Sequence, residues 1–520
     1  MKKYLFTSLA AISLVSIVGC NTGFEQDVAD MQSTSGEADF STYVAIGNSL
    51  TSGFRDNALY LDGQKESYPS IIATQMKRAG GGDFEQPLMP NNDGGFSNLP
   101  GFPGKLELKL VNGSLSPIPK SAGSELKHTP AGKLYNNVGV PAAKSYHLLV
   151  EGYGNPANLP SKKANPYFVR FASSPNTSII KDVIAKKPSF FSLWIGNNDV
   201  LLYATSGGVG KDQKGNTNAQ TYDMYDISDP SVVAGSIDRV LASLKAEGIT
   251  KGVIANIPDI GSIPFFTTVP YNPLSPANPS FGPMIPKLNE NFSALNKAFT
   301  ALGVPERSIS FSNTKASEII IKDRDIKDIG PLLSFALTPF VGAQKAKLLG
   351  SLYGQARPAT ASDFVLLTAS SQIGKVNTEA YKNFKKLGLS DDEAGQLAIN
   401  GVTFPMEDQY ILTPNEQKLI QNAVTAYNTA ISALAKKYGI GLVDAYAKMK
   451  ELNTLSGIQY NGVKYTNTFV TGGAFSLDGI HLTGRGYAAI ANEFIKTINA
   501  QYKSTLPQVN PNDYSGIKFP

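Results

Sequence analysis

Four short apolar runs, each ending in a polar turn, constrain the fold of this chain more than any other feature. The runs cover residues 43–46, 190–195, 252–255 and 440–443, and each is followed at once by Gly, Asn or Asp. Strands that are apolar throughout are typical of a parallel sheet that is buried on both faces. We therefore expect four buried parallel strands whose carboxyl ends carry polar loops.

Helical patterns separate these runs. Asp229 and Pro230 are typical of a helix start, and apolar residues at helical spacing follow them. Thr413 and Glu416 form a capping box before a second such pattern, and a last helix is expected to begin near Thr483. Strands that alternate with helices predict an α/β fold, with a parallel sheet as the middle layer of three.

The chain of 520 residues is longer than such a core requires. A minimal α/β core takes roughly 200 residues. We therefore interpret residues 41–505 as one domain with insertions at about 88–130, 200–228 and 260–410, the last of them large and mostly helical. Residues 506–520 are interpreted as a C-terminal tail.

The N-terminus has the features of an export signal. Two lysines precede an apolar stretch at 4–18, which is too short to span a bilayer comfortably. The stretch ends at Cys20, the only cysteine, in a pattern that resembles a bacterial lipobox. We expect residues 1–19 to be a lipoprotein signal peptide, and 20–40 to be the lipidated cysteine with a flexible tether. The residue after Cys20 is not Asp, which favours the outer membrane, at its periplasmic face or at the cell surface.

Composition disfavours several classes of function. The net charge of +5 is small and no long basic run is present, so we expect no nucleic-acid partner. A single cysteine cannot form an intrachain disulfide or a cysteine zinc cluster. None of the three histidines lies in an H-E-x-x-H pair. We therefore expect neither a metal nor a cofactor.

Polar residues with complementary chemistry follow the predicted strands. Ser49 comes after the first run, Asn198 after the second, and Asp478 and His481 stand just before the last helix. In an open parallel sheet, ligands bind beyond the carboxyl ends of the strands. A serine nucleophile needs a base, and the base needs an orienting acid, so these residues could form a catalytic site there.

The four motifs together resemble the SGNH/GDSL hydrolase family. The matching blocks, in family order, are 47–50, 137–141, 196–199 and 478–482. The resemblance implies a three-layer α/β/α fold, Ser49 as nucleophile, His481 as base and Asp478 as orienting acid. It also implies an oxyanion hole made by the Ser49 and Gly139 N–H groups and the Asn198 side chain. Asn48 departs from the family pattern, which has Asp there, but Asn keeps the capacity to accept hydrogen bonds.

The activity implied by the resemblance is that of a serine carboxylic ester hydrolase, a GDSL-type lipase or acylhydrolase that works through an acyl-serine intermediate. An apolar insertion on a lipid-anchored enzyme favours a lipid or long-chain acyl ester as substrate. Phe265 and Phe266 are candidates for an acyl groove because they follow a predicted core strand. The alternative is that they belong to a satellite core.

Three rival interpretations stay open or are disfavoured by the sequence. A polysaccharide or sugar-ester deacetylase of the same fold is the nearest rival. A non-enzymatic surface lipoprotein that binds through this fold is less consistent with an intact Ser49, Asp478 and His481. An α/β-hydrolase lipase would need glycine where Thr51 stands.

Overall fold

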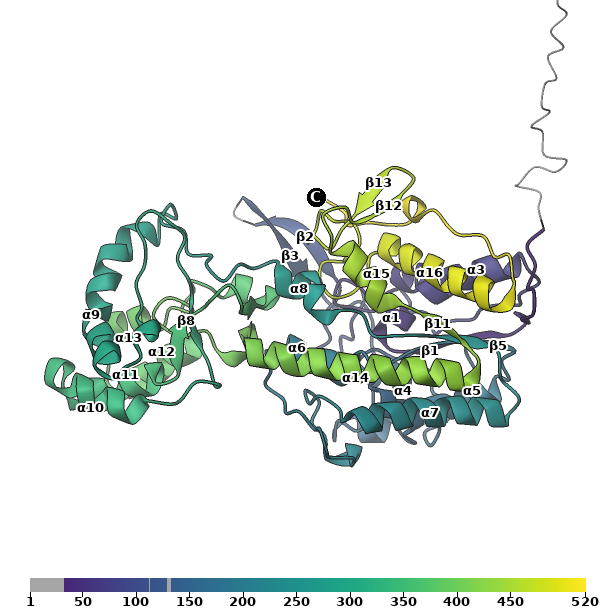
Figure 1. Ribbon diagram of the computed structural model, residues 1–520, viewed down its shortest axis with the longest axis horizontal. Coiled ribbons are helices and arrows are strands. Elements are labelled where there is room, and N and C mark those ends of the chain that lie inside the picture. The colour runs from purple at the N-terminus through teal and green to yellow at the C-terminus, as the bar shows by residue number, and fades with distance from the viewer. Residues whose placement is uncertain (1–31, 112, 129–131) are drawn as a thin grey trace, which may run out of the picture.

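A parallel five-stranded sheet forms the centre of the molecule in the computed structural model, which describes residues 32–111, 113–128 and 132–520 (Figure 1). Its strand order is β11-β6-β5-β1-β4. The strands are β1 (Tyr43–Gly47), β4 (Asn137–Gly139), β5 (Phe190–Trp194), β6 (Gly252–Ala255) and β11 (Gly441–Val443). All four predicted runs are in this sheet, and the second sequence motif supplies the fifth strand. Every pairing is parallel.

Helices cover both faces of the sheet, so the predicted three-layer α/β/α architecture is confirmed (Figure 1). One face carries α3 (Tyr68–Lys77), α15 (Ala445–Leu452) and α16 (Gly484–Tyr502). The other carries α5 (Ile179–Ala185), α7 (Pro230–Ala246) and α14 (Pro414–Tyr438). Thr413 caps α14 through a capping box with Glu416, as the sequence predicts.

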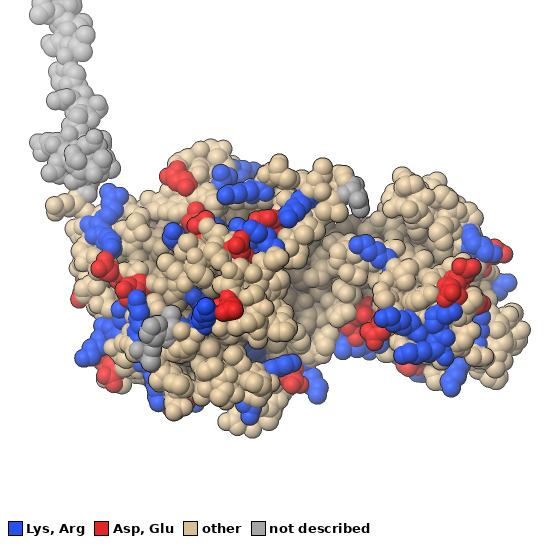
Figure 2. All heavy atoms as spheres, turned by 180° about the vertical axis from the view of Figure 1, so that it is seen from behind, with Lys and Arg blue, Asp and Glu red and all other residues tan. Residues whose placement is uncertain are grey.

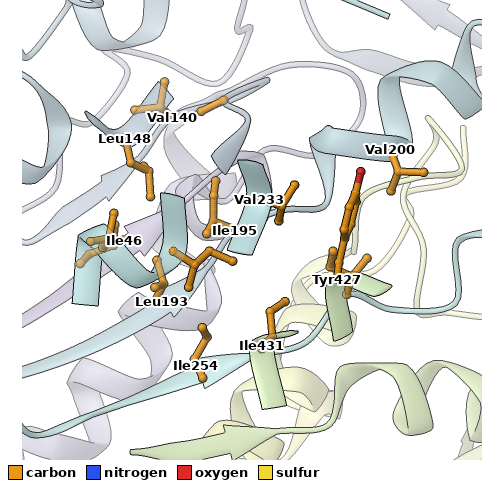
Figure 3. Packing of buried hydrophobic residues seen from close by; sticks show 14 of the residues in the cluster. Ile46, Val140, Leu148, Leu193, Ile195, Val200, Val233, Ile254, Tyr427 and Ile431 are labelled. Carbon is orange, nitrogen blue, oxygen red and sulfur yellow. The ribbon is translucent and has the colours of Figure 1, made fainter. Parts of the chain in front are cut away.

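Alternation along the strands divides the core into two clusters. In β5, Phe191 and Leu193 face the α7 and α14 side, whereas Phe190 and Trp194 face the α16 side. Figure 3 shows the first cluster, where strand residues such as Ile254 meet helix residues such as Ile431. Burial of each such side chain contributes about 1.5–3 kcal/mol, so both faces hold the helices against the sheet.

The insertion at 260–410 forms a second lobe at one end of the molecule (Figure 1). Its helices are α9 (Ile285–Ala301), α10 (Gly330–Val341), α11 (Ala343–Tyr353), α12 (Thr378–Lys386) and α13 (Asp391–Leu397). The lobe has an apolar cluster of its own, to which Leu333 and Leu337 of α10 belong. Leu332, Phe335 and Phe340 of the same helix are exposed. The insertion is therefore mostly helical, and most of its apolar content serves its own core.

Shorter elements complete the structure. The remaining short helices of the main domain and its junction with the lobe are α1 (Ser49–Ser52), α2 (Leu61–Lys65), α4 (Pro166–Val169), α6 (Asn198–Thr205) and α8 (Pro264–Thr267). The small strand pairs are β2 (Leu106–Val111) with β3 (Ser114–Pro119), β7 (Ile320–Lys322) with β8 (Ala356–Pro358), β9 (Phe364–Val365) with β10 (Ile411–Leu412), and β12 (Ile458–Tyr460) with β13 (Val463–Tyr465).

The folded part extends beyond the predicted bounds of 41–505. Within the expected tether of 20–40, Phe40 is buried against Phe190, with ring centroids 5.1 Å apart. In the expected tail of 506–520, Leu506 is buried and Val509 N–H donates to Asn492 at 2.9 Å. A few apolar and amide contacts within mainly polar segments fix both ends to the core.

The predicted signal peptide and Cys20 lie outside the described residues. Among the helices that the structure describes, none has the length and apolar character needed to cross a membrane.

Candidate active site

Ser49 lies at the carboxyl end of β1, where the chain turns into α1. Gly47 permits this turn, because a Cβ there would come within 2.4 Å of the Trp194 carbonyl oxygen. Asn48 caps α1 by accepting a hydrogen bond from Leu50 N–H at 3.1 Å. The amide oxygen of Asn48 therefore supplies the cap that an Asp would supply.

The structure brings Ser49, His481 and Asp478 into one hydrogen-bonded chain. His481 Nε2 lies 2.9 Å from Ser49 Oγ, across 432 residues of sequence. His481 Nδ1 lies 2.9 Å from Asp478 Oδ2. The Asp478 to His481 turn is tight, because the backbone N–H groups of Ile480 and His481 both donate to Asp478 Oδ1. The arrangement is that of a nucleophile, a base and an orienting acid.

The charge on Asp478 sets the tautomer of His481. Burial of Asp478 raises its pKa, but the charge of His481 and the hydrogen bonds from His481 and Ile480 outweigh burial and hold the pKa well below its usual range. The carboxylate therefore stays ionised and accepts the Nδ1–H. With the proton on Nδ1, Nε2 has a free lone pair that can accept the Ser49 Oγ–H.

A second set of residues holds Asp478 in place, and sequence reasoning missed it. Asn57 N–H donates to Asp478 Oδ2 at 2.9 Å, and Ser476 Oγ donates to Asp478 Oδ1 at 3.1 Å. Asp56 and Asn57 have φ of 53° and 59°, in the left-handed region that Asp and Asn tolerate better than most residues. The Asp56–Asn57 pair was the available sequence signal for this turn.

Asn198 begins α6, at the carboxyl end of β5. Its side-chain amide donates to Ala143 O at 2.9 Å, which fixes the amide plane. Asn198, Ser49 and His481 line one small cavity of about 40 Å³. An amide has two N–H donors, so one remains for a ligand in this cavity.

The prediction for Gly139 is wrong. Its N–H donates to Asn137 Oδ1 at 3.0 Å and is therefore not available to a substrate oxygen. A Cβ on Gly139 would come within 2.4 Å of Ser52 N, so this glycine permits β4 to pack closely against α1.

Ala142, three residues further on, is the better candidate for this role. It has φ of 63°, and within the described parts of the chain its N–H has no hydrogen-bond acceptor. It precedes Ala143, whose carbonyl accepts from Asn198. Sequence reasoning missed Ala142, since alanine gives no signal of left-handed backbone.

The comparison with protein families agrees with this geometry. Residues 370–494 match the model of the GDSL-like lipase/acylhydrolase family. The matched stretch contains Asp478 and His481. The resemblance drawn from the four sequence motifs is thereby confirmed at the family level, although Ser49 and Asn198 precede the matched residues. A comparison with curated proteins finds no match.

Phe265 and Phe266 do not line the cavity at Ser49. Both are buried, and Phe266 stacks on Phe364 with ring centroids 6.0 Å apart. Phe265 N–H donates to Gly479 O at 3.0 Å, which supports the turn between Asp478 and His481. Phe266 lines a wider cleft nearby, whereas Phe265 lines neither space, so the walls of the cavity at Ser49 come from other residues.

A larger cleft of about 420 Å³ begins beside the cavity at Ser49, and Ile260 lines both. Its wall mixes aromatic and aliphatic side chains with polar ones, among them Asp259, Gln417, Gln421 and Asn453. Figure 2 shows from behind that the surface is hollowed where the second lobe meets the main domain, with both signs of charge interspersed. Among the described residues, no cluster of three or more His, Cys, Asp and Glu could hold a metal ion.

Proposed function

We propose that the protein is a serine ester hydrolase with Ser49 as nucleophile, His481 as general base and Asp478 as orienting acid. The match to an acylhydrolase family supports hydrolysis of acyl esters in general. The single observation that carries the assignment of residues is the unbroken hydrogen-bonded chain from Asp478 through His481 to Ser49 Oγ.

The reaction has two halves, acylation of Ser49 and hydrolysis of the acyl-serine, and His481 first accepts and then donates a proton in each. As Ser49 Oγ bonds to the acyl carbon, its proton passes to His481 Nε2. The bond to the alcohol oxygen then breaks, and His481 gives that proton to the departing alcohol. Water next attacks the acyl-serine, loses a proton to His481 and releases the acid, and the proton returns to Ser49.

The oxygen that becomes negative in each half needs fixed donors. The free N–H of the Asn198 amide, the Ala142 N–H and the Ser49 N–H at the start of α1 could supply them. Donors aimed at a developing charge in a small cavity are worth about 10²–10³ in kcat each.

The wide cleft favours a substrate whose alcohol part is polar. Amide and carboxylate groups of Gln417, Gln421, Asn453 and Asp259 line it, next to Tyr446. Such a wall suits the hydroxyl groups of a glycerol or sugar alcohol. A sugar-ester or polysaccharide deacetylase is therefore the second candidate, and the length of the preferred acyl chain distinguishes it from a lipase.

We also propose that the enzyme is exported and anchored through lipid on Cys20. The sequence supports this, with a charged start, an apolar stretch and the only cysteine at its end. Acyl chains on one cysteine are sufficient for stable membrane attachment when more than one is present.

The decisive experiment measures p-nitrophenyl acetate and butyrate hydrolysis by the Cys20→Ser chain, which carries no lipid. Ser49→Ala in that background should lower kcat/KM by about 10³-fold or more, and Ser49→Ala with His481→Ala should cost little beyond either change alone. Ser41→Ala, an exposed serine before β1, is the matched control and should have no effect. Unchanged turnover in Ser49→Ala would refute the mechanism.

A further inference from the structure

A second cavity, apolar almost throughout, lies behind the catalytic serine on the α15 and α16 side of the sheet. Its volume is about 90 Å³. Strand, loop and helix residues contribute to it, and the aliphatic and aromatic part of the wall includes Trp194, Met449, Leu452, Phe475, Leu482 and Ile490. A cavity with such a wall favours hydrocarbon over water.

The wall between this cavity and the one at Ser49 consists of four residues that line both, namely Leu50, Pro258, Ile263 and Ile480. Leu50 directly follows the nucleophile, and Ile480 directly precedes His481. Leu50 and Ile480 are half-buried, so their side chains have room to change rotamer. A chain attached to the Ser49 acyl carbon would therefore reach the second cavity by displacing one or two aliphatic side chains.

We propose that this cavity is the acyl-chain pocket, and that it makes the enzyme selective for esters of short to medium acyl chains. The proposal rests on the ester hydrolase function proposed above and names its substrate class. The acyl chain would then bind between Trp194, α15 and α16, and not beside Phe265 and Phe266.

The polarity of the two spaces beside Ser49 decides which half of the ester goes where. The wide cleft carries amide and carboxylate groups beside its apolar residues, so it can accept a polar alcohol half. In the apolar cavity the only charged lining residue is Lys448, whose ammonium pairs with Glu451 and Glu493 at 2.6 and 3.3 Å. A cation already held by two carboxylates is poorly placed to attract an anionic ligand, so the cavity favours a neutral hydrocarbon chain.

The volume sets the preferred length. The two cavities, at about 90 and 40 Å³, approach the ~150 Å³ engineered cavity that holds benzene. An acyl chain of about six carbons is therefore the expected limit. Burial of methylenes should raise kcat/KM by roughly three- to tenfold per two-carbon step from acetate to hexanoate, and little beyond.

Ala489 offers a way to fill the pocket without touching the catalytic groups. It lies on α16, lines the cavity and is half-buried. Ala489→Phe in the Cys20→Ser chain should remove most of the preference for p-nitrophenyl hexanoate over acetate, measured as the ratio of the two kcat/KM values. Ala500→Phe, at an exposed position of the same helix, is the control and should leave the whole chain-length profile unchanged.

Trp194 gives a readout that does not require turnover. It is the only tryptophan in the sequence and it lines the pocket, so fluorescence excited near its absorption edge reports on this site alone. In the Ser49→Ala form, ethyl hexanoate should change the Trp194 emission at lower concentration than ethyl acetate does. Ala489→Phe should abolish the difference, and Ala500→Phe should preserve it.

The outcomes separate the pocket from the function. If hydrolysis depends on Ser49 but Ala489→Phe does not alter the chain-length profile, the assignment of the acyl pocket is wrong. The proposed esterase function would still stand. Equal responses of Trp194 to ethyl hexanoate and ethyl acetate would also overturn the pocket assignment. Loss of the hexanoate preference together with the Trp194 response would establish it, whereas activity that persists in Ser49→Ala would refute the esterase mechanism alone.

Discussion

At the scale of single residues, the site depends on which polar groups remain free as much as on which are present. Ala142 lies three residues after Gly139, just beyond the motif at 137–141, and of these two residues only Ala142 has an N–H without an acceptor within the described parts of the chain. Asn137 Oδ1 occupies the N–H of Gly139, so the N–H of Ala142 is the one that can bind a developing oxyanion.

This difference can be tested at Ala142. Ala142→Gly should retain activity within a few-fold, because glycine adopts φ of 63° without strain. Ala142→Val should lower kcat by tenfold or more, since a β-branched residue resists that backbone and displaces the N–H. Steady-state kinetics with p-nitrophenyl butyrate would measure both, and Asn198→Ala should lower kcat by about 10²–10³ in the same assay. Equal kcat for Ala142→Gly and Ala142→Val would exclude Ala142 as a donor.

His147 should make the fold sensitive to acid. Burial, and then the charge of Lys144, lower the pKa of His147 to about 3. The ring accepts a hydrogen bond from Lys144 N–H and stacks on Tyr153. In the unfolded chain the His147 ring becomes protonated below pH ~6.5. In the folded chain the ring stays neutral until about pH 3.

The free energy of unfolding should therefore fall as pH drops from 6.5 towards 3, by at most about 1.4 kcal/mol per pH unit from this residue. Urea unfolding at pH 7 and pH 5 measures the slope. His147→Gln, whose amide oxygen can still accept from Lys144, should flatten it, and His128→Gln, in an exposed loop, should not. An unchanged slope in His147→Gln would contradict this assignment.

At the scale of elements, the turn at Asp56 and Asn57 connects the N-terminal part of the domain to Asp478, the proposed orienting acid. Asn57 acts through its backbone N–H, which donates to Asp478 Oδ2 at 2.9 Å while Asn57 has a left-handed φ of 59°. Asn57→Gly should thus retain activity within about twofold, whereas Asn57→Val should lower kcat and also shift the pH profile of kcat/KM, because Asp478 would orient His481 less well. Identical pH profiles for the two variants would show that this turn has no role in positioning.

At the scale of the whole molecule, the chain has three parts, namely the central domain, the second lobe and the N-terminal segment. The lobe stands at the end of the molecule away from the described N-terminus (Figure 1). It has an apolar core of its own, whereas the insertion residues Ile260 and Phe266, which line the wide cleft, pack in the core cluster of the main domain.

Anchoring is tested on the whole chain. Cys20→Ser should leave the protein unlipidated, so it should move from the detergent phase to the aqueous phase in a two-phase detergent partition, while ester hydrolysis in solution stays unchanged. The unsubstituted chain, expressed in the same bacterial host, is the control. Equal partition of the two forms would refute the lipoprotein assignment.

Much of this protein could be predicted from local sequence pattern. Apolar runs of strand length, the Thr413 capping box and the spacing of Asp478 and His481 depend on neighbours within a few residues. Periodicity and turn chemistry are local properties, so the α/β/α order followed from them, whereas the roles of Ser49, Asp478 and His481 were implied by the family resemblance of the four motifs.

Only the tertiary structure decided the rest. That Ser49 and His481 lie 2.9 Å apart, that Ala142 and not Gly139 keeps a free N–H, and that Phe265 and Phe266 pack inside all depend on partners distant in sequence. The apolar cavity has the same origin, because its wall is assembled from the ends of β5 and β6 and from α1, α15 and α16. A local pattern specifies which side a residue faces, whereas the space left between elements is set only when they pack together.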